Sequence, residues 1–157
     1  YEIVFGDWSS DVCSPISFDI KKISPGIYRS RLHLELDGIE VFNFTLREVV
    51  PNIKALLKET GQTLEQIDHV VFHQANRLIN ETLRKMLKLD PVKVPYSIRE
   101  FGNTSGASVP LTMLVALRES LQNGSLKLLL SAFGVGLSWG SVILETNRIC
   151  IPELIEV

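Results

Sequence analysis

Short apolar segments alternate with amphipathic segments along most of the chain, and this alternation limits the possible folds more than any other feature of the sequence. Apolar residues recur at helical spacing in residues 39–60, 76–89 and 105–121. The compact apolar segments that have the length of buried strands are residues 69–72, 92–96, 126–133 and 141–145. Because strands that alternate with helices pack in layers, the sequence predicts an α/β layered fold.

Turn-forming and helix-breaking residues refine this pattern. Residues 24–26 (Ser-Pro-Gly) are a turn signal between two short alternating segments, residues 18–22 and 32–36, which have the pattern of strands. Pro51 lies inside the first helical segment, where a proline removes a backbone donor and crowds the preceding turn. We therefore expect either a kink at Pro51 or two abutting helices in place of one.

Composition excludes several classes of protein. The chain has 157 residues, of which 45% are hydrophobic and 22% are charged, with a formal net charge of −2. This composition fits one folded domain and excludes intrinsic disorder, and the weak net charge argues against nucleic-acid or polybasic membrane binding. Two cysteines alone form neither a disulfide framework nor a conventional zinc site, so we expect no metal and a cytoplasmic setting. The longest apolar run, residues 126–144, contains Lys127 and several glycines and is a poor membrane span.

The first residues of the chain are unlike the rest. Residues 7–14 (Asp-Trp-Ser-Ser-Asp-Val-Cys-Ser) match the translation of a widely used sequencing adapter, and residues 1–3 fit the same oligonucleotide. The alternative is a strand at residues 2–5 followed by a polar loop. We favour the first interpretation, which makes residues 1–17 a non-native segment and residues 18–157 the domain that concerns fold and function.

Three segments carry polar residues or glycines where the surrounding elements are apolar. The first is His73-Gln74-Ala75-Asn76, at the end of a predicted strand and the start of a predicted helix. Open α/β sheets place ligands at the carboxyl ends of their strands. The alternative is that His73 and Asn76 only cap the helix that follows.

The other two segments are rich in small residues. Residues 101–108 (Phe-Gly-Asn-Thr-Ser-Gly-Ala-Ser) let the backbone approach a ligand closely, or else form a loop and a helix cap. Residues 133–141 (Phe-Gly-Val-Gly-Leu-Ser-Trp-Gly-Ser) have the composition of a hairpin turn. They lack the Lys-Ser/Thr ending of a phosphate-binding loop.

In this order and at these spacings, the three segments resemble the C-terminal half of the thiolase-like condensing enzymes, specifically the β-ketoacyl-acyl-carrier-protein synthase III group. Residues 37–44 (Asp-Gly-Ile-Glu-Val-Phe-Asn-Phe) also resemble the segment before a helix in that family. The resemblance covers roughly residues 37 to 145. It implies the C-terminal half of a thiolase-like fold, a layered α-β-α arrangement with a mixed sheet.

The resemblance also implies an activity and its substrates. In this family a cysteine takes an acyl group from acyl-CoA, and malonyl-acyl-carrier protein is then decarboxylated to a carbanion that attacks the acyl-enzyme. His73 and Asn103 match the family's catalytic histidine and asparagine. Two neutral N–H donors suit this step because they stabilise the negative charge on the thioester oxygen without transferring a proton. No cofactor is implied beyond these two substrates.

The remaining site assignments follow from the same resemblance. The backbone N–H of Val135, where the family usually has glycine, is expected in the oxyanion hole. Arg77 is a candidate contact for the carrier protein, although solvated surface charge explains it equally well. The residues expected to support the site are Gln74, Asn76, Gly134 and Gly136.

The family's nucleophilic cysteine has no counterpart in this sequence. Cys13 lies in the segment that matches the adapter, and Cys150 follows the last predicted strand. We therefore expect an acyltransferase fragment that is inactive alone, with the cysteine on a missing N-terminal half and a homodimer when full length. The alternatives are a non-catalytic interaction module with the same fold, and a partner subunit that works with a separate cysteine-bearing chain.

Overall fold

The computed structural model describes residues 21–29, 37–134 and 136–155, which fall into two compact units, Tyr1–Gly38 and Ile39–Val157. In the first unit, β1 (Lys21–Ser24) pairs with β2 (Ile27–Arg29) in an antiparallel hairpin, so the expected turn is confirmed. The second strand begins directly after this turn, earlier than expected. The segment expected to be non-native, residues 1–17, and the strand expected at residues 32–36 both lie outside the described residues.

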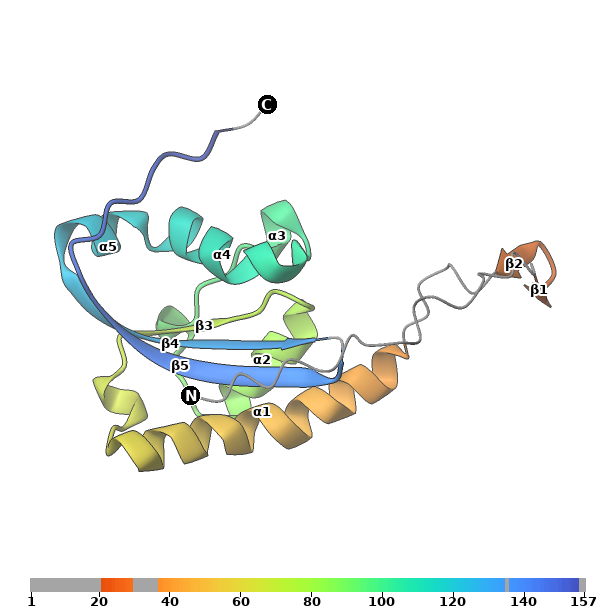
Figure 1. Cartoon of the computed structure of the whole chain (residues 1–157), viewed down its shortest axis with the longest axis horizontal. Coiled ribbons are helices and arrows are strands. Elements are labelled where there is room, and N and C mark those ends of the chain that lie inside the picture. The colour runs from red at the N-terminus through yellow and green to blue at the C-terminus, as the bar shows by residue number, and fades with distance from the viewer. Residues whose placement is uncertain (1–20, 30–36, 135, 156–157) are drawn as a thin grey trace, which may run out of the picture. The chain divides into compact units, whose positions relative to one another are not determined.

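The second unit is built on a mixed sheet, as Figure 1 shows. β4 (Ser125–Gly134) is the central strand; it pairs in parallel with β3 (His69–Phe72) and antiparallel with β5 (Ser138–Asn147). The three strands expected at residues 69–72, 126–133 and 141–145 are therefore confirmed. Val70, Val71 and Phe72 are fully buried, which places β3 between two covered faces.

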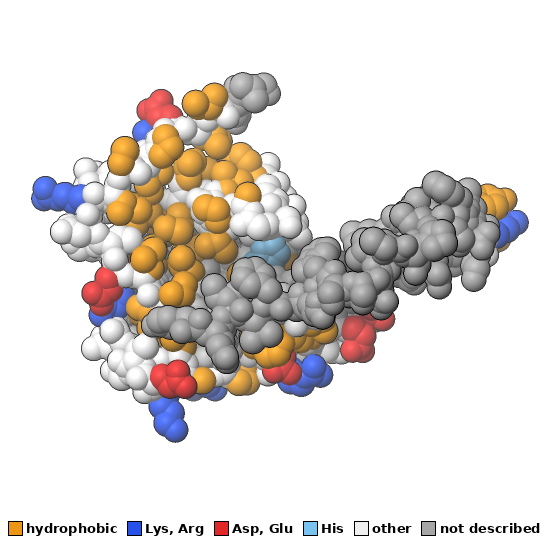
Figure 2. All heavy atoms as spheres, in the orientation of Figure 1, with side chains coloured by type: hydrophobic (Ala, Val, Ile, Leu, Met, Phe, Trp, Pro, Cys, Tyr) orange, Lys and Arg blue, Asp and Glu red, His pale blue; other side chains and the backbone are white. Residues whose placement is uncertain are grey.

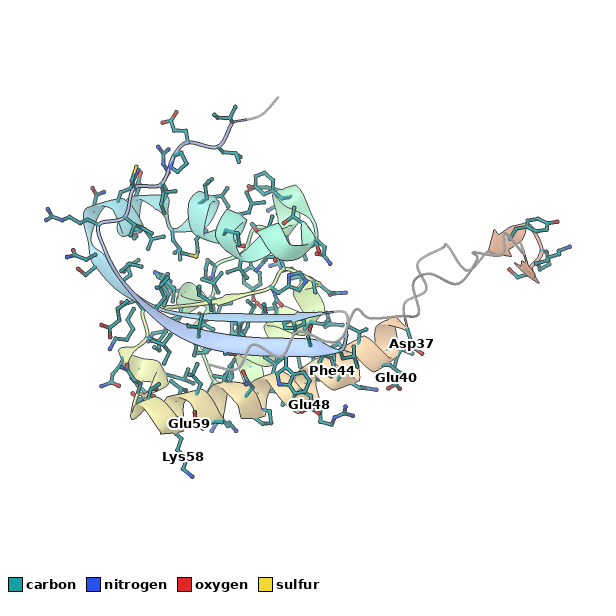
Figure 3. All side chains as sticks on the ribbon, in the orientation of Figure 1. Asp37, Glu40, Phe44, Glu48, Lys58 and Glu59 are labelled. Atoms are coloured by element: carbon teal, nitrogen blue, oxygen red, sulfur yellow. The ribbon has the colours of Figure 1, made fainter. Side chains whose placement is uncertain are left out.

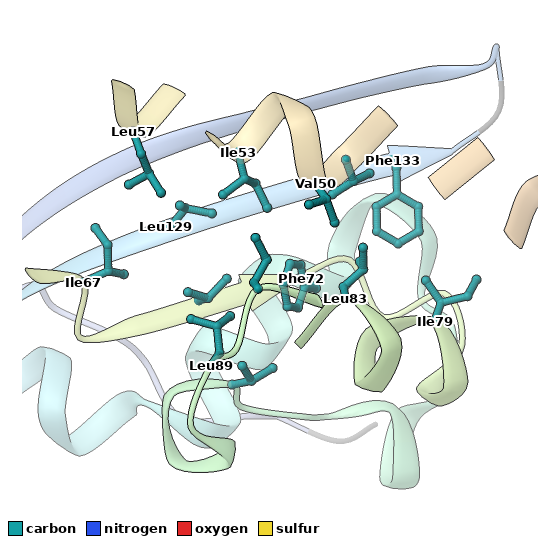
Figure 4. Close-up of a cluster of buried hydrophobic side chains, with 14 of the residues drawn as sticks. Val50, Ile53, Leu57, Ile67, Phe72, Ile79, Leu83, Leu89, Leu129 and Phe133 are labelled. Atoms are coloured by element: carbon teal, nitrogen blue, oxygen red, sulfur yellow. The ribbon is translucent and has the colours of Figure 1, made fainter. Parts of the chain in front are cut away.

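One face of the sheet is covered by α1 (Gly38–Thr60) and α2 (Arg77–Met86). Their apolar side chains meet those of β3 and β4 in the larger of two cores, drawn in Figure 4. The residues labelled there are Val50, Ile53, Leu57, Ile67, Phe72, Ile79, Leu83, Leu89, Leu129 and Phe133. On the other face, α4 (Ser108–Ala116) and α5 (Arg118–Asn123) pack on Val71 and Leu128 in the second core. The predicted α-β-α layering is confirmed.

α1 is a single helix, so the alternative of two abutting helices is wrong. It continues from Gly38 to Thr60 through Pro51, which is exposed. Because Pro51 is on the exposed side of the helix, the carbonyl that loses its helical partner is open to solvent, where a proline costs less. Figure 3 shows Phe44 on the side of α1 next to the sheet and Lys58 pointing away from it. The Phe44 ring meets Trp139 of β5 edge to face, with ring centroids 5.3 Å apart.

The prediction of a strand at residues 92–96 is also wrong. The structure has a short 3₁₀ helix there, η3 (Pro91–Lys93), whose cap is Asp90: the carboxylate accepts the Val92 N–H. Lys93 then donates from Nζ to the carbonyl groups of Leu64, Glu65 and Ile67, at 3.0, 3.1 and 2.6 Å. Leu64 and Glu65 belong to the 3₁₀ helix η2 (Leu64–Gln66), and Ile67 is the residue that ends it. One ammonium group therefore links η3 to η2.

The helix expected at residues 105–121 is divided. A 3₁₀ turn, η4 (Ser105–Ala107), leads into α4, and Leu117 separates α4 from α5 with φ −122° and ψ 5°. A further short helix, α3 (Ile98–Phe101), precedes them. The division matters for the site because it makes Ser108 the first residue of a separate helix that packs on β3.

None of the helices in the described ranges combines the length and apolar character needed to cross a bilayer. Within the same ranges, no three His, Cys, Asp or Glu side chains come together as metal ligands would.

Candidate active site

His73 directly follows β3, at the carboxyl end of that strand. Its backbone N–H donates to the Ser131 carbonyl of β4 at 2.8 Å, which continues the parallel pairing by one residue. The ring is half-buried and lies edge-on to Phe133, with centroids 5.4 Å apart and planes at 79°. Its Nδ1 lies 2.5 Å from the Oγ of Ser108, the first residue of α4. Partial burial lowers the pKa of His73 below its ordinary value of 6.5, so the ring is neutral at pH 7.

This lowered pKa predicts how stability depends on pH. Below pH 6.5 the unfolded chain protonates His73 before the folded chain does, so the unfolded state binds more protons. We expect the free energy of unfolding to fall as the pH drops from 6.5 to the folded-state pKa of His73. Urea unfolding at several pH values, compared with a His73→Gln variant, measures this. An equal pH dependence in both proteins would contradict the prediction.

Gln74 joins β3 to the loop before α3. Its side chain is fully buried; Nε2 donates to the Phe72 carbonyl at 2.9 Å, and Oε1 accepts the backbone N–H groups of Ser97 and Ile98 at 3.2 and 3.3 Å. Its own backbone N–H donates to Ser108 Oγ at 3.2 Å. Because the side chain is fully buried and both ends of its amide bond to backbone groups, Gln74 holds the segments around His73.

Asn76 and Arg77 open α2. The Asn76 side chain accepts the Leu78 N–H at 2.7 Å and caps the helix, as the capping alternative expected for this residue. The guanidinium of Arg77 is exposed and lies over the Tyr96 ring, 5.8 Å from its centroid. Burial, together with the hydrogen bond that the Tyr96 hydroxyl donates to Glu81 at 2.7 Å, raises the pKa of Tyr96 well above its ordinary value. Arg77 is thus held at the surface by an aromatic ring that is itself anchored to α2.

Asn103 is exposed, in the turn that leads into η4 and α4. Gly102 before it has φ +65° and ψ −153°, a conformation that side chains oppose, so glycine is required there. Asn103 Oδ1 accepts the Ser105 backbone N–H at 2.9 Å. Because a backbone N–H only donates, this contact identifies the oxygen of the amide. The group of Asn103 that remains for a ligand is therefore the Nδ2 amide, a donor.

The glycine-rich turn joins β4 to β5. Val135, the expected oxyanion-hole residue, lies outside the described residues. Gly136 has φ +138°, and a Cβ there would lie 3.1 Å from the Ser138 backbone nitrogen. Gly134 has no such constraint, since a Cβ there would meet nothing within 4 Å. The two glycines expected to support the site therefore differ: only Gly136 has a backbone that requires glycine.

We expect Gly136→Ala to destabilise the protein by about 1–3 kcal/mol, because alanine is forced into a disfavoured conformation and against Ser138. Gly134→Ala is the matched control, with an expected change within about 0.5 kcal/mol. Chemical denaturation of the two variants beside the unmodified chain measures the difference. Equal losses in both variants would show that the strain at Gly136 is unimportant.

The structure brings some of the predicted residues together and leaves others apart. His73 and Gln74 both meet Ser108 at the start of α4, and Asn103 lies in the turn that enters this helix. Asn76 and Arg77 contact α2 and Tyr96 instead. Sequence reasoning missed Ser108 and Phe133 as partners of the His73 ring. Both stand inside motifs that it singled out, but neither motif reveals a contact with a residue as distant in the chain as His73.

The mixed sheet between two helical layers is a thiolase-like fold, shared with solved 3-oxoacyl-(acyl-carrier-protein) synthases. The chain belongs to the 3-oxoacyl-[acyl-carrier-protein] synthase III family: residues 57–146, more than half of its length, match the model described as the C-terminal part of that synthase. The resemblance and the thiolase-like fold expected from the sequence are confirmed.

Individual relatives agree with this assignment. A β-ketoacyl-[acyl-carrier-protein] synthase III of Streptococcus equi subsp. zooepidemicus is 40% identical over 118 residues, covering 71% of this chain and 35% of the relative. The crystal structure of a 3-oxoacyl-(acyl-carrier protein) synthase from Burkholderia xenovorans LB400 matches with TM-score 0.75 and 38% identity, over 78% of this chain and 35% of that one. The priming β-ketosynthase of the R1128 polyketide pathway matches with TM-score 0.64 and 32% identity, over 75% and 35%. The chain thus spans about a third of the length of these relatives.

Proposed function

We propose that the chain is the C-terminal part of a decarboxylating condensing enzyme, which joins an acyl group from acyl-CoA to malonyl-acyl-carrier protein. The observation that carries this proposal is the neutral ring of His73 at the end of β3, held against the start of α4 by Ser108, with the Asn103 amide in the turn entering the same helix. Both side chains provide N–H donors, the groups that stabilise a developing oxyanion.

The proposed reaction has two half-reactions. A cysteine thiolate on the N-terminal part attacks the acyl-CoA carbonyl and releases CoA as the thiol, which leaves an acyl-enzyme. The malonyl thioester then loses CO₂, and the electrons of the broken C–C bond move into the thioester as an enolate. The enolate carbon attacks the acyl carbonyl, forms the new C–C bond and expels the cysteine thiolate. No metal or cofactor takes part.

His73 and Asn103 act in the decarboxylation. Negative charge grows on the thioester oxygen as CO₂ leaves, and two fixed N–H donors stabilise that oxygen more than they stabilise the uncharged substrate. The lowered pKa of His73 supports this role, because a neutral imidazole donates a hydrogen bond without a proton transfer. The backbone N–H of Val135 is proposed for the corresponding role in the acyl-transfer step, with Gly134 and Gly136 shaping its turn.

The second unit has an exposed apolar surface that is suited to binding an N-terminal half. Figure 2 shows hydrophobic side chains gathered over α4, α5 and the adjoining sheet. Val142 and Leu144 of β5 are 49% and 37% exposed, and Val109, Met113 and Leu114 of the helices are only partly buried. Exposed apolar side chains that adjoin one another in this way are typical of an interface. We propose that the cysteine-bearing half covers it and that the full-length enzyme is a homodimer.

Arg77 is proposed as a contact for the carrier protein. Its exposed guanidinium, held over Tyr96, offers a fixed cation to an acidic partner such as a phosphopantetheine-bearing carrier. Charge reversal by Arg77→Glu is expected to raise the KM for malonyl-acyl-carrier protein and leave the KM for acyl-CoA unchanged.

A chimera tests the proposed function. The second unit, Ile39–Val157, replaces the matching C-terminal part of the Streptococcus equi synthase, which supplies the cysteine-bearing half. We expect this chimera to form a β-ketoacyl product from acyl-CoA and malonyl-acyl-carrier protein. A folded chimera that acylates its cysteine but releases no CO₂ would contradict the proposal and favour a non-catalytic interaction module.

A further inference from the structure

The contacts of Ser108 bear on which nitrogen of His73 carries the proton. Ser108 is fully buried, and its hydroxyl lies between two groups: the backbone N–H of Gln74, which donates to Oγ at 3.2 Å, and His73 Nδ1, at 2.5 Å. Within the described part of the chain, these are the two hydrogen bonds of this hydroxyl. These two contacts together determine the direction of each hydrogen bond and so the position of the proton on His73.

The Gln74 contact has a fixed direction, because a backbone N–H only donates. Ser108 Oγ therefore accepts there, and its own proton needs an acceptor. If His73 carried its proton on Nδ1, the hydroxyl would face two donors, and its buried proton would have no partner among the described groups. If Nδ1 is unprotonated, it accepts the hydroxyl proton and every group is satisfied.

We propose that Ser108 is a positioning residue that fixes His73 as the tautomer protonated on Nε2, by donating its hydroxyl proton to Nδ1. The Nε2–H is then the donor that His73 offers to the thioester oxygen, so the importance of Ser108 for catalysis rests on the proposed function. The tautomer itself does not. A hydroxyl orients the imidazole here as a carboxylate or carbonyl does in other enzymes.

The position of Ser108 is itself fixed by neighbours on two elements. Thr112, one turn later in α4, donates from Oγ1 to the Ser108 carbonyl at 2.7 Å and shares a 2.6 Å hydrogen bond with the hydroxyl of Ser97. The Ser97 backbone N–H in turn donates to Gln74. A network of buried hydrogen bonds therefore joins the strand end that carries His73 to the helix that carries Ser108.

Nitrogen-15 NMR of the histidine rings in the 157-residue chain reads the tautomer directly, with His73→Gln used to assign the signals. We expect a protonated Nε2 and an unprotonated Nδ1 at neutral pH. We expect Ser108→Ala to give a mixture of tautomers, and Ser108→Thr, which keeps the hydroxyl, to restore the original pattern. Thr146→Val is the matched control: it removes a buried hydroxyl of β5 that hydrogen-bonds the Leu126 backbone and lies outside the Ser108 network, so the ring signals stay as they are.

Kinetics in the chimera separate this proposal from the proposed function. Ser108→Ala is expected to lower the kcat of malonyl decarboxylation roughly 10- to 100-fold, the usual effect of losing a group that orients a histidine, with cysteine acylation unchanged. A proton on Nδ1, or ring signals unaffected by Ser108→Ala, would overturn the role of Ser108. If His73→Ala slows decarboxylation but Ser108→Ala does not, the proposed function stands and the role of Ser108 is wrong. If His73→Ala itself has no effect, the proposed function fails while the NMR result still decides the tautomer.

Discussion

His73→Ala and Asn103→Ala are each expected to slow decarboxylation of malonyl-acyl-carrier protein in the chimera by about 10²–10³-fold, the cost of losing one donor to a developing oxyanion. Acylation of the cysteine by acyl-CoA is expected to continue, because the thioester oxygen that these donors face belongs to the malonyl substrate. Release of labelled CO₂ measures decarboxylation, and intact-mass spectrometry of the acyl-enzyme measures cysteine acylation.

Two matched substitutions control for loss of the side chain alone. His69→Ala removes the other described histidine, at the opposite end of β3. Asn147→Ala removes an exposed asparagine that accepts a hydrogen bond from Ser125 at the end of β5. Both are expected to keep decarboxylation near the unmodified rate. If His73→Ala and Asn103→Ala lowered both half-reactions equally, the roles assigned to these two residues would be wrong.

Gln74→Leu is expected to cause a large loss of stability. Leucine of similar size leaves the Phe72 carbonyl and the backbone N–H groups of Ser97 and Ile98 without their partner. A buried polar group without a partner costs about 1–3 kcal/mol, so we expect a loss of roughly 3 kcal/mol or more. For a chain of this size, such a loss lowers the melting temperature by about 10 °C.

Gln66→Leu is the control for this substitution. Gln66 is exposed and makes one side-chain hydrogen bond, accepting the Thr63 N–H at 2.9 Å, so its loss is expected to cost less than about 1 kcal/mol. Thermal unfolding followed by circular dichroism compares the two variants. Similar melting temperatures for both would mean that the buried amide of Gln74 does not hold the loop before α3.

Local patterns in the sequence were sufficient for the elements that bury one continuous apolar face. The segment at residues 69–72 is a buried strand, and the helix expected from residue 76 begins at Arg77 with Asn76 as its cap. In both cases the signal is contained in a few neighbouring residues: an apolar run in one, a capping side chain before an amphipathic repeat in the other. The layered arrangement follows from the alternation of such elements.

The errors occurred where distant contacts outweigh local preference. The valines at positions 92 and 94 suggested a strand, but Lys93 is held by backbone carbonyl groups from residues 64–67. The motif at residues 101–108 indicated a site, yet the reason that Ser108 matters is a contact with His73, 35 residues earlier. No periodicity or propensity in a single sequence encodes such a contact, so the tertiary structure was needed to find it.

The measurement that tests the central claim most directly is the rate of malonyl decarboxylation in the chimera with Asn103→Asp. A carboxylate at this position still accepts the Ser105 N–H and so preserves the turn, but it presents an anionic oxygen where asparagine presents its Nδ2 donor. If Asn103 stabilises an enolate, the aspartate variant decarboxylates at least as slowly as Asn103→Ala, about 10²–10³-fold below the unmodified chimera. If Asn103 serves only to shape the turn, the aspartate variant retains the unmodified rate, and that result would contradict the account.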